Sequence, residues 1–273
     1  MNETVTRALS GAVYIIILIT AILLSEISFV ILFAVFMLIA IYEYCRLVKT
    51  GFIIPAIASV AILLPFVLSK DNSIATLIFT IFSVVINSYL LFKLFIRESG
   101  LPKSHISKSI QLTGYVTLPF LLIIRLPFVD ACADGYVYTP HLLISIFVLI
   151  WLNDTFAYIV GKSFGKHKLF ERISPKKTIE GFIGGFIFAL AGAYFISFYY
   201  KLLTPAQWLA TAAIVSVFGT LGDLVESKLK RNAGVKDSGN IMPGHGGILD
   251  RQDSIIFAIP FLFLLYQIIH YVS

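Results

Sequence analysis

Two apolar runs near the N-terminus decide the fold class. Residues 9–24 read LSGAVYIIILITAILL and residues 27–44 read ISFVILFAVFMLIAIYEY, and only Ser25 and Glu26 separate them. Both runs lack the polar–apolar alternation of a half-buried strand, and both are close to the roughly 20 residues that a helix needs to cross a bilayer. The first run has no Ala-x-Ala cleavage site, so we expect a retained membrane span rather than a signal peptide.

The composition of the whole chain agrees with these runs. The 273 residues are 58% hydrophobic and 13% charged, whereas a typical soluble domain carries about 25% charged residues. This composition excludes a single soluble domain, a secreted disulfide scaffold, a collagen and a disordered chain. At roughly 20 residues per span, the chain has room for about nine or ten helices with short connections.

Nine apolar runs follow one another along the chain. Their length and lack of alternation are typical of membrane helices rather than of barrel strands. We therefore predict an all-α, polytopic integral membrane protein. Residues 1–140 are expected to carry about five spans, and residues 141–273 the remaining spans and the functional site. The runs cover residues 9–24, 27–44, 52–69, 74–95, 106–124, 140–161, 179–200, 206–223 and 254–272.

Basic residues indicate the side of the membrane that each connection faces. Of the 21 lysines and arginines, all but Lys70, Arg125 and Lys201 fall in the N-terminal segment or in every second connection after it. Cytoplasmic loops are enriched in Lys and Arg, so we expect a cytoplasmic N-terminus, an external C-terminus and a multi-pass protein of the inner (cytoplasmic) cell membrane. The same bias accounts for the net charge of +6 without a nucleic-acid partner.

Acidic side chains indicate where the functional site lies. They avoid the centres of the spans and gather near the cytoplasmic helix ends. Asp154 is the deepest, eight residues before Lys162 or about 12 Å along a helix, and a carboxylate at that depth is costly without a partner. We therefore place the site at headgroup depth on the cytoplasmic face. The acidic residues near these helix ends are Glu43, Asp154, Glu180, Asp223, Asp250 and Asp253.

The last cytoplasmic loop and the helix ends beside it carry most of the reactive groups. If the eighth helix continues past the membrane, Asp223, Ser227 and Lys230 share one face at positions i, i+4 and i+7. Asp250 and Asp253 open the last helix, where carboxylates also suit the helix dipole. Oxygen ligands from Asp223 and Asp250 are suited to a hard cation such as magnesium.

Residues 243–247, between these helices, read PGHGG. Glycines let backbone N–H groups approach an anion closely, although a plain turn is the simpler explanation of a Gly-Gly pair alone. His245 has no second histidine at metal spacing, and three roles stay open for it: a phosphate contact, a proton donor or a loop-ordering residue. The chain contains no Gly-x4-Gly-Lys-Ser/Thr sequence, which excludes a Walker loop.

The preceding cytoplasmic loop is basic and includes a candidate anion site. Ser174 followed by Pro175 is typical of a helix start, with an N-cap and then proline in the first turn. Lys176 and Lys177 would then lie beside the free N–H groups of a helix N-terminus, which is an anion-binding arrangement. Membrane topology alone explains the basic residues of this loop equally well.

These two loops resemble the integral-membrane phosphatidate cytidylyltransferase (CDP-diacylglycerol synthase) family. The similarity extends over at least residues 151–253, whereas the first 140 residues match mainly in hydropathy. Met242 and Gln252 depart from the pattern at flanking positions where other apolar residues are expected. The family's signature falls on Ser227, Lys230, Arg231, Lys236, Asp237, Gly239, Pro243, His245, Gly246, Gly247, Asp250, Arg251 and Asp253.

The resemblance implies a nucleotidyltransferase that transfers the cytidylyl group of CTP to phosphatidate, giving CDP-diacylglycerol and pyrophosphate for phospholipid biosynthesis. It also implies a two-cation centre with Mg²⁺ and a second ion that could be monovalent, such as K⁺. The expected partners are CTP, phosphatidate and the lipid bilayer, with a homodimer as a candidate assembly.

Roles follow as hypotheses from this resemblance and from the residue types. Asp223 and Asp250 hold the divalent metal. Phosphate binding falls to Lys230, Arg231, Lys236 and Arg251, while Lys176 and Lys177 grip either CTP or the lipid headgroup. Asp237 and Asp253 orient basic partners or metal-bound water, and Asp154 supports the metal or pairs with a lysine. The remaining substrate-binding candidates are Ser227, His245, Gly246 and Gly247.

Two other readings of the chain stay open. One is a related lipid enzyme, either a CTP-dependent polyprenol or phytol kinase, which the full signature disfavours, or a cytidylyltransferase for an archaeal ether lipid. The other is a transporter or proton channel, which would place ionisable groups near the midplane and often show inverted repeats. The chain shows neither feature. A CDP-alcohol phosphotransferase is disfavoured because the Asp-Gly-x-x-Ala-Arg motif is absent.

Overall fold

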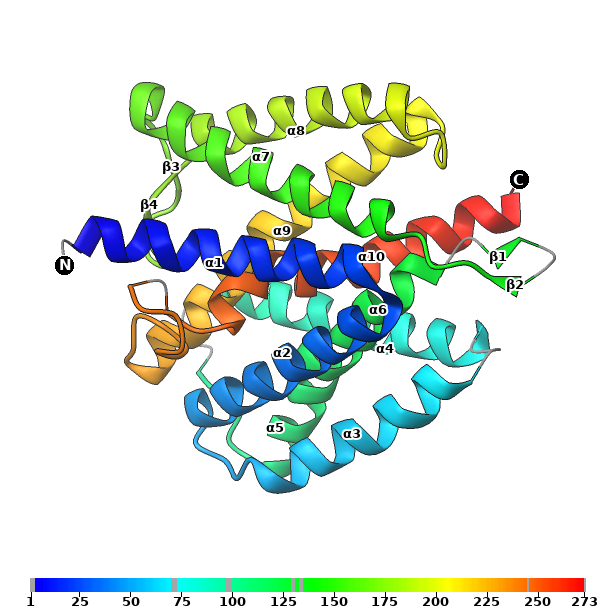
Figure 1. Ribbon diagram of the computed structural model, residues 1–273. Coiled ribbons are helices and arrows are strands. Elements are labelled where there is room, and N and C mark those ends of the chain that lie inside the picture. The colour runs from blue at the N-terminus through cyan, green and yellow to red at the C-terminus, as the bar shows by residue number, and fades with distance from the viewer. Residues whose placement is uncertain are drawn as a thin grey trace.

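The structure is a computed structural model that describes residues 3–69, 73–96, 100–128, 131–132, 135–244 and 246–272. Most of these residues are helical (Figure 1). The α-helices are α1 (Glu3–Leu24), α2 (Glu26–Leu47), α3 (Ile53–Leu68), α4 (Ser73–Phe95), α5 (His105–Leu112), α6 (Leu118–Arg125), α7 (Pro140–Phe164), α8 (Ile179–Tyr199), α9 (Pro205–Ala233) and α10 (Leu249–Val272).

The remaining elements are short. A π-helical turn over Thr113–Thr117 joins α5 to α6, and a 3₁₀ turn over Leu126–Phe128 continues α6. Together they form one apolar segment, His105–Phe128. Strands β1 (Ala131–Cys132) and β2 (Gly135–Tyr136) pair in antiparallel fashion, as do β3 (Lys168–Phe170) and β4 (Ser174–Thr178). Both hairpins are too short to form a layer of the fold.

The chain is an all-α, polytopic membrane protein, as its composition predicts. Across the described ranges, seven helices are long and apolar enough to cross a membrane, and the apolar helices Ala8–Leu24 and Ile53–Leu68 are shorter. Each of the nine predicted runs coincides with one of these segments. Isoleucines on α1, α3 and α4 face outward, where a bilayer would cover them.

The ends of the helices gather at two opposite ends of the bundle (Figure 1). The start of α1, the β3–β4 hairpin and the loop between α9 and α10 lie at the left end of the view, and β1–β2 and the end of α10 lie at the right. Between them, α6 and the middle of α10 form the core, since every residue from Leu118 to Ile124 and from Ile255 to Ile259 is buried. The basic loops therefore share one end of the molecule.

Local sequence signals set the bounds of α9. Thr204 and Gln207 form a capping box, each side chain accepting the other's backbone N–H, and Pro205 occupies the first turn. The helix continues to Ala233, ten residues beyond the end of the apolar run, and stops at Gly234, whose φ of 75° is the left-handed conformation that favours glycine. The extension includes Ser227 and Lys230, so it meets the condition under which the sequence aligns them with Asp223.

Small residues let α9 and α10 approach closely. A Cβ atom on Gly222 would meet the Phe257 side chain and the Asp253 carbonyl oxygen, so the two backbones leave no room for a larger residue there. This approach brings the carboxylate-bearing end of α9 next to the first turn of α10. Helix packing, rather than the loop alone, therefore assembles the acidic residues.

The prediction of a helix start at Ser174-Pro175 is wrong. Residues Ser174–Thr178 form strand β4, and α8 begins at Ile179 with the Thr178 hydroxyl accepting the Gly181 N–H at 3.1 Å. Proline drives the residue before it toward extended backbone, and pairing with Lys168–Phe170 stabilises that conformation. Lys176 and Lys177 therefore lie on a strand that leads into the N-cap of α8, and not in the first turn of a helix.

Candidate active site at the helix ends

Asp250, in the first turn of α10, is the most heavily bonded carboxylate of the site. Its Oδ1 atom accepts from the Lys230 Nζ at 2.6 Å. Its Oδ2 atom accepts from the Ser238 N–H at 2.9 Å, the Ser238 hydroxyl at 2.8 Å and the Gly247 N–H at 2.7 Å. Asp250 therefore joins α9, the start of the loop and the end of the loop.

Lys230 is shared between two acidic residues. Besides Asp250, it donates to Glu226 Oε2 at 2.7 Å, one turn earlier on α9. Glu226 is fully buried, and its Oε1 atom has no hydrogen-bond partner among the described residues. A lysine buried between two carboxylates is a stable cation, because each neighbouring charge offsets the cost of its burial.

Asp223 forms a second, more open pair. Its Oδ2 atom lies 2.6 Å from the Lys177 Nζ of β4, and its Oδ1 atom accepts the Ser227 hydroxyl at 3.1 Å. Burial by itself would lower the pKa of Lys177, but the Asp223 carboxylate, supported by Asp154 and Asp253, outweighs it and raises that pKa above its usual range. Lys177 is therefore a permanent cation at neutral pH, and the predicted alignment of Asp223 with Ser227 on one helix face is confirmed.

Two further carboxylates complete the acidic cluster. Asp253 is buried at 8% exposure and accepts only the adjacent Ser254 N–H, at 2.7 Å, among the described contacts. Asp154, on α7, accepts from the Asn153 amide at 3.3 Å and lines two cavities. Among the described residues, no lysine or arginine lies at ion-pair distance from Asp154 or Asp253. The predicted pairing of Asp154 with a lysine is therefore not found among these residues.

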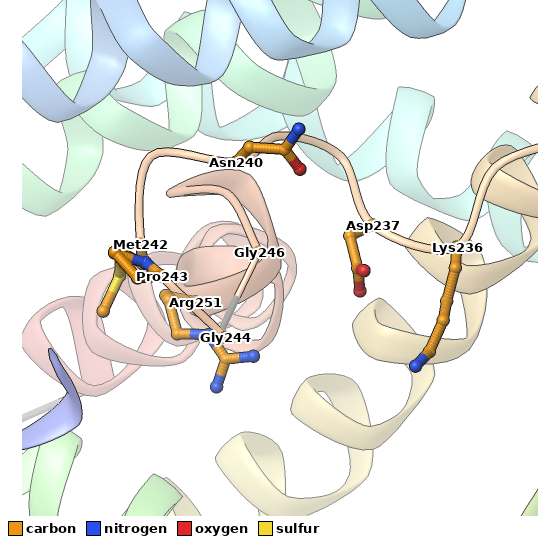
Figure 2. Close-up of a pocket in the computed structure, with 8 residues that line it drawn as sticks. All are labelled: Lys236, Asp237, Asn240, Met242, Pro243, Gly244, Gly246 and Arg251. Carbon is orange, nitrogen blue, oxygen red and sulfur yellow. The ribbon is translucent and has the colours of Figure 1, made fainter. Parts of the chain in front are cut away.

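A polar cavity of about 540 Å³ lies under the loop between α9 and α10. Figure 2 shows the loop arching over it, with the side chains of Lys236, Asp237 and Arg251 extending to the same side. Gly244 and Gly246 have φ of 76° and 90° and leave backbone exposed along the wall. The lining therefore combines two cations with accessible backbone, which suits an anionic ligand.

A second cavity of about 690 Å³ lies between α7, α8, α9 and the β3–β4 hairpin. Lys162, Lys168, Lys176 and Lys177 line it together with apolar side chains such as Phe182. A smaller cavity of about 230 Å³ shares Arg251 with the first cavity and Asp154 with the second. The acidic cluster therefore lies where the three cavities adjoin.

The structure separates the predicted site residues into groups. Lys236, Asp237, Gly246 and Arg251 line the first cavity, and Lys176, Lys177, Asp154 and Asp223 line the second. Lys230, Asp250, Gly247 and Ser227 form the bonded framework between them. Arg231 instead donates to the Val235 carbonyl oxygen at 2.7 Å and lines none of the described cavities. His245 lies outside the described residues.

Three residues of the framework were not predicted as site residues. Glu226 lies one turn from Lys230, so helical spacing could have indicated the pair. Ser238 bonds Asp250, but a serine in a loop gives no signal of its own. Glu43 was noted as an acidic residue near a helix end, but its partners Ile248 and Leu249 lie 205 and 206 residues away in the sequence. No local pattern reports such a contact.

The flanking departures Met242 and Gln252 fit the local structure. Met242 is buried and lines the first cavity, and its backbone bridges Gly246. Gln252 is fully buried and donates its side-chain amide to the Tyr14 hydroxyl at 2.6 Å, which joins α10 to α1. The side-chain nitrogen of Gln252 is therefore paired, while its buried Oε1 atom has no hydrogen-bond partner among the described residues.

Fold and site together define a helical, polytopic membrane protein with a lysine–carboxylate centre at one set of helix ends. The chain belongs to the family described as the cytidylyltransferase family, whose model matches residues 5–269.

Curated relatives agree with this membership. The chain is 35% identical over 280 residues to the phosphatidate cytidylyltransferase of Bacillus subtilis (strain 168), which covers 97% of this chain and 98% of that protein. The protein of the same name from Staphylococcus aureus (strain COL) is 53% identical over 131 residues, 46% of this chain and 48% of that protein. The phosphatidate cytidylyltransferase of Staphylococcus haemolyticus (strain JCSC1435) is 43% identical over 181 residues, which are 58% of this chain and 70% of that protein. The resemblance drawn from the two loops is confirmed.

Proposed function

We propose that this protein catalyses the transfer of the cytidylyl group of CTP to phosphatidate, giving CDP-diacylglycerol and pyrophosphate. The observation that carries the proposal is the cluster of lysines and carboxylates where a polar cavity adjoins a partly apolar one. The reaction requires that a nucleotide from water and a phospholipid from the bilayer bind next to each other, and two adjoining cavities of this kind provide such a site. The family membership and the names of the relatives support the same reaction.

The first cavity suits the nucleotide. Lys236 and Arg251 supply cations for the phosphates, and the backbone at Gly244 and Gly246 has no side chain to hold an anion at a distance. Asp237, next to Lys236 in the chain, lines the same cavity and would orient a basic partner there. The cavity has the volume expected of a small-ligand site, about 300–1,000 Å³.

The second cavity suits the lipid. Lys176 and Lys177 would hold the phosphate of phosphatidate, and Phe182 and Tyr158 line the same cavity with apolar surface for the glycerol and upper acyl chain. Since Lys177 also pairs with Asp223, the lipid phosphate would arrive beside the acidic cluster. This placement favours the lipid headgroup over CTP as the ligand of the two lysines.

The reaction needs positioning and charge neutralisation more than proton transfer. A phosphate oxygen of phosphatidate forms a bond to the α-phosphorus of CTP, and the bond from that phosphorus to the oxygen bridging to the β-phosphate breaks, so pyrophosphate leaves. The nucleophile is already an anion near neutral pH. Lys230, Arg251 and Lys236 would offset the charge that accumulates on the phosphates.

The donor set of the acidic cluster fits a hard divalent cation. Asp253 is a buried carboxylate with no cationic partner in the described part of the chain, and Asp223 is a third exposed. Mg²⁺ would be held by Asp223 and Asp250, with Asp253 beside them, and it neutralises nucleotide phosphates when bound. No three such side chains within the described ranges converge into a complete site, so phosphates and water would supply other ligands. A second ion such as K⁺ stays a prediction.

We further propose nine crossings with a cytoplasmic N-terminus, in the inner (cytoplasmic) membrane. The alternation of helix ends in Figure 1 supports this arrangement, as does the gathering of basic loops at one end. Residues 1–140 would form an N-terminal set of helices and residues 141–273 the set that carries most of the site. Reporter fusions after each helix, together with crosslinking for a homodimer, test these assignments.

The direct test uses purified protein in detergent with dioleoyl phosphatidate, labelled CTP and magnesium. We expect equal amounts of lipid-extractable cytidine label and released pyrophosphate, and we expect both to vanish when EDTA removes the metal. If neither product forms in the presence of magnesium, the proposal is contradicted. Other lipid phosphates, including ether lipids, and then lipid alcohols with CTP as phosphate donor, would distinguish the related enzymes. Inactivity toward all of them would favour a transporter.

A further inference from the structure

Glu43 is a buried carboxylate near the end of α2 that contacts the loop between α9 and α10. Its side chain is 1% exposed. Its oxygens accept from the Ile248 N–H at 3.1 Å, the Leu249 N–H at 2.8 Å and the Ser238 hydroxyl at 3.2 Å. Three donors from one loop therefore converge on one acidic group that belongs to a different part of the chain.

These bonds replace the N-cap that α10 lacks in its own sequence. The first N–H groups of a helix have no partner within the helix, and Ile248, where the chain enters α10, has no side-chain oxygen to offer. A carboxylate from α2 accepts two of these N–H groups and also places negative charge at the positive end of the helix dipole. The start of α10 is thus held by α2.

Two glycines of the loop make room for this carboxylate. A Cβ atom on Gly239 or on Gly247 would overlap the Glu43 carboxylate in each case. Gly239 follows the first donor of the loop and Gly247 precedes the other two. Gly247, the second glycine of the Gly-Gly pair in PGHGG, therefore leaves space for the Glu43 carboxylate. Its own N–H donates to Asp250.

Ser238 links Glu43 to the centre of the site. Its hydroxyl lies within hydrogen-bond distance of both Glu43 Oε2 and Asp250 Oδ2, and its N–H donates to Asp250. Asp250 in turn holds Lys230. Glu43 thus grips the loop at both of its ends, residues 238–239 and 247–249, and the segment between these ends walls the first cavity.

We infer that Glu43 is a positioning residue for the nucleotide cavity: it holds the described loop residues 238–244 and 246–249 in the shape that binds the phosphates of CTP. That the ligand is CTP rests on the proposed function, whereas the hydrogen bonds between Glu43 and the loop do not depend on it. Glu43 touches no substrate in this arrangement and acts through Ser238, Gly247 and the start of α10.

The test is Glu43→Gln, which keeps the size of the side chain but replaces one acceptor with an N–H₂ group that faces donors. We expect the KM for CTP to rise about tenfold or more, as the loss of a charged hydrogen bond predicts, and the KM for phosphatidate to stay within about twofold. Glu26→Gln is the matched control, because Glu26 lies exposed at the other end of α2, and it should match the wild type in both constants.

A merely structural role would give a different result. Glu43→Gln would then reduce the amount of folded, active protein while the KM for CTP stayed unchanged, and that outcome would overturn the inference. Ser238→Ala provides a second variant in case Glu43→Gln does not fold, and it should raise the same KM by a smaller factor. An unchanged KM in that variant would also count against the inference.

Hydrogen exchange separates this inference from the proposed function. Amide protons of residues 238–242, 244 and 246–249 should exchange faster in Glu43→Gln than in the wild type, whether or not the wild type turns over CTP. An inactive wild type would overturn the reaction proposed above and leave exchange to decide on Glu43. Equal exchange of these amides in the two proteins would overturn the positioning role.

Discussion

The two lysine–carboxylate pairs of the site differ in how far they are enclosed. Lys230 and Asp250 have side chains that are 10% and 5% exposed, whereas those of Lys177 and Asp223 are 29% and 35% exposed. The N···O distance is 2.6 Å in both pairs. The same chemistry thus occurs once inside a bonded framework and once on the wall of a cavity.

The two pairs therefore have different roles: the enclosed pair stabilises the loop and the helices, and the open pair can exchange its partner for a ligand. Asp250 receives four donors from three segments, so it holds the loop and the two helices together. Asp223 receives only Lys177 and Ser227 among the described donors, and its cavity wall leaves it open to a ligand. A substrate phosphate or a cation could displace Lys177 from Asp223 with little disturbance. A cation at Asp250 would instead bind beside Lys230, because loss of Lys230 would loosen the loop.

Asp250→Asn should have the largest effect, because it affects both activity and stability. Loss of a charge-stabilising carboxylate predicts a fall in turnover of about 10²-fold or more. Breaking a buried pair also leaves Lys230 uncompensated on one side, at a cost of about 3 kcal/mol. Steady-state kinetics and a thermal melt in detergent measure the two effects. Near-normal activity would remove the proposed metal role of Asp250.

Asp223→Asn should cost a similar 10²-fold or more in turnover, but with little loss of stability. The pair is about a third exposed, and such pairs contribute at most about 1 kcal/mol. The melting temperature should therefore stay close to that of the wild type. A melting temperature that falls as far as in Asp250→Asn would show that the contrast between the two pairs is wrong.

Lys177→Ala should reduce turnover by about tenfold, in line with one charged contact to a phosphate. Lys162→Ala is the matched control, since Lys162 lines the same cavity but lies near the Tyr158 ring, at 5.8 Å, and pairs with no carboxylate among the described residues. Equal losses in the two variants would contradict the ranking of these lysines.

The pH dependence adds a second measurement on Lys177. Its pKa is raised, so it stays protonated well above neutrality. The ratio of wild-type to Lys177→Ala activity should therefore be constant between about pH 6 and 9. A ratio that falls as the pH rises within that window would mean that Lys177 loses its proton there, and that the neighbouring carboxylates do not hold it charged.

Thr178→Ala should have the smallest effect. The Thr178 hydroxyl caps α8, and loss of such a cap costs about 1 kcal/mol. Lys177 should stay on β4, so turnover should change by less than about threefold, less than 1 kcal/mol. A thermal melt and a kinetic assay measure both quantities. A loss as large as that of Lys177→Ala would mean that the cap, and not only the strand, positions the lysine.

Much of the fold could be predicted from the sequence because a bilayer leaves few choices. Apolar runs without alternation must form helices in lipid, and the structure has helices at all nine of them. The alignment of Asp223 with Ser227 follows from helical spacing once α9 continues past its apolar run, and the structure meets that condition. The β3–β4 hairpin was not predicted, since Ser174-Pro175 suits a helix start and a strand equally well until Lys168–Phe170 pairs with it.

Hydropathy and a motif with fixed gaps are local properties of the chain, so they identify the class of protein, the residue types of the site and the family without any coordinates. Tertiary structure alone decided that Lys177 pairs with Asp223, that Lys230 joins Glu226 to Asp250, and that Glu43 holds the start of α10. The close approach of α9 and α10 at Gly222 and the crossing of α2 set these distances. Partners separated by up to 206 residues leave no periodic signal, so only packing brings them together.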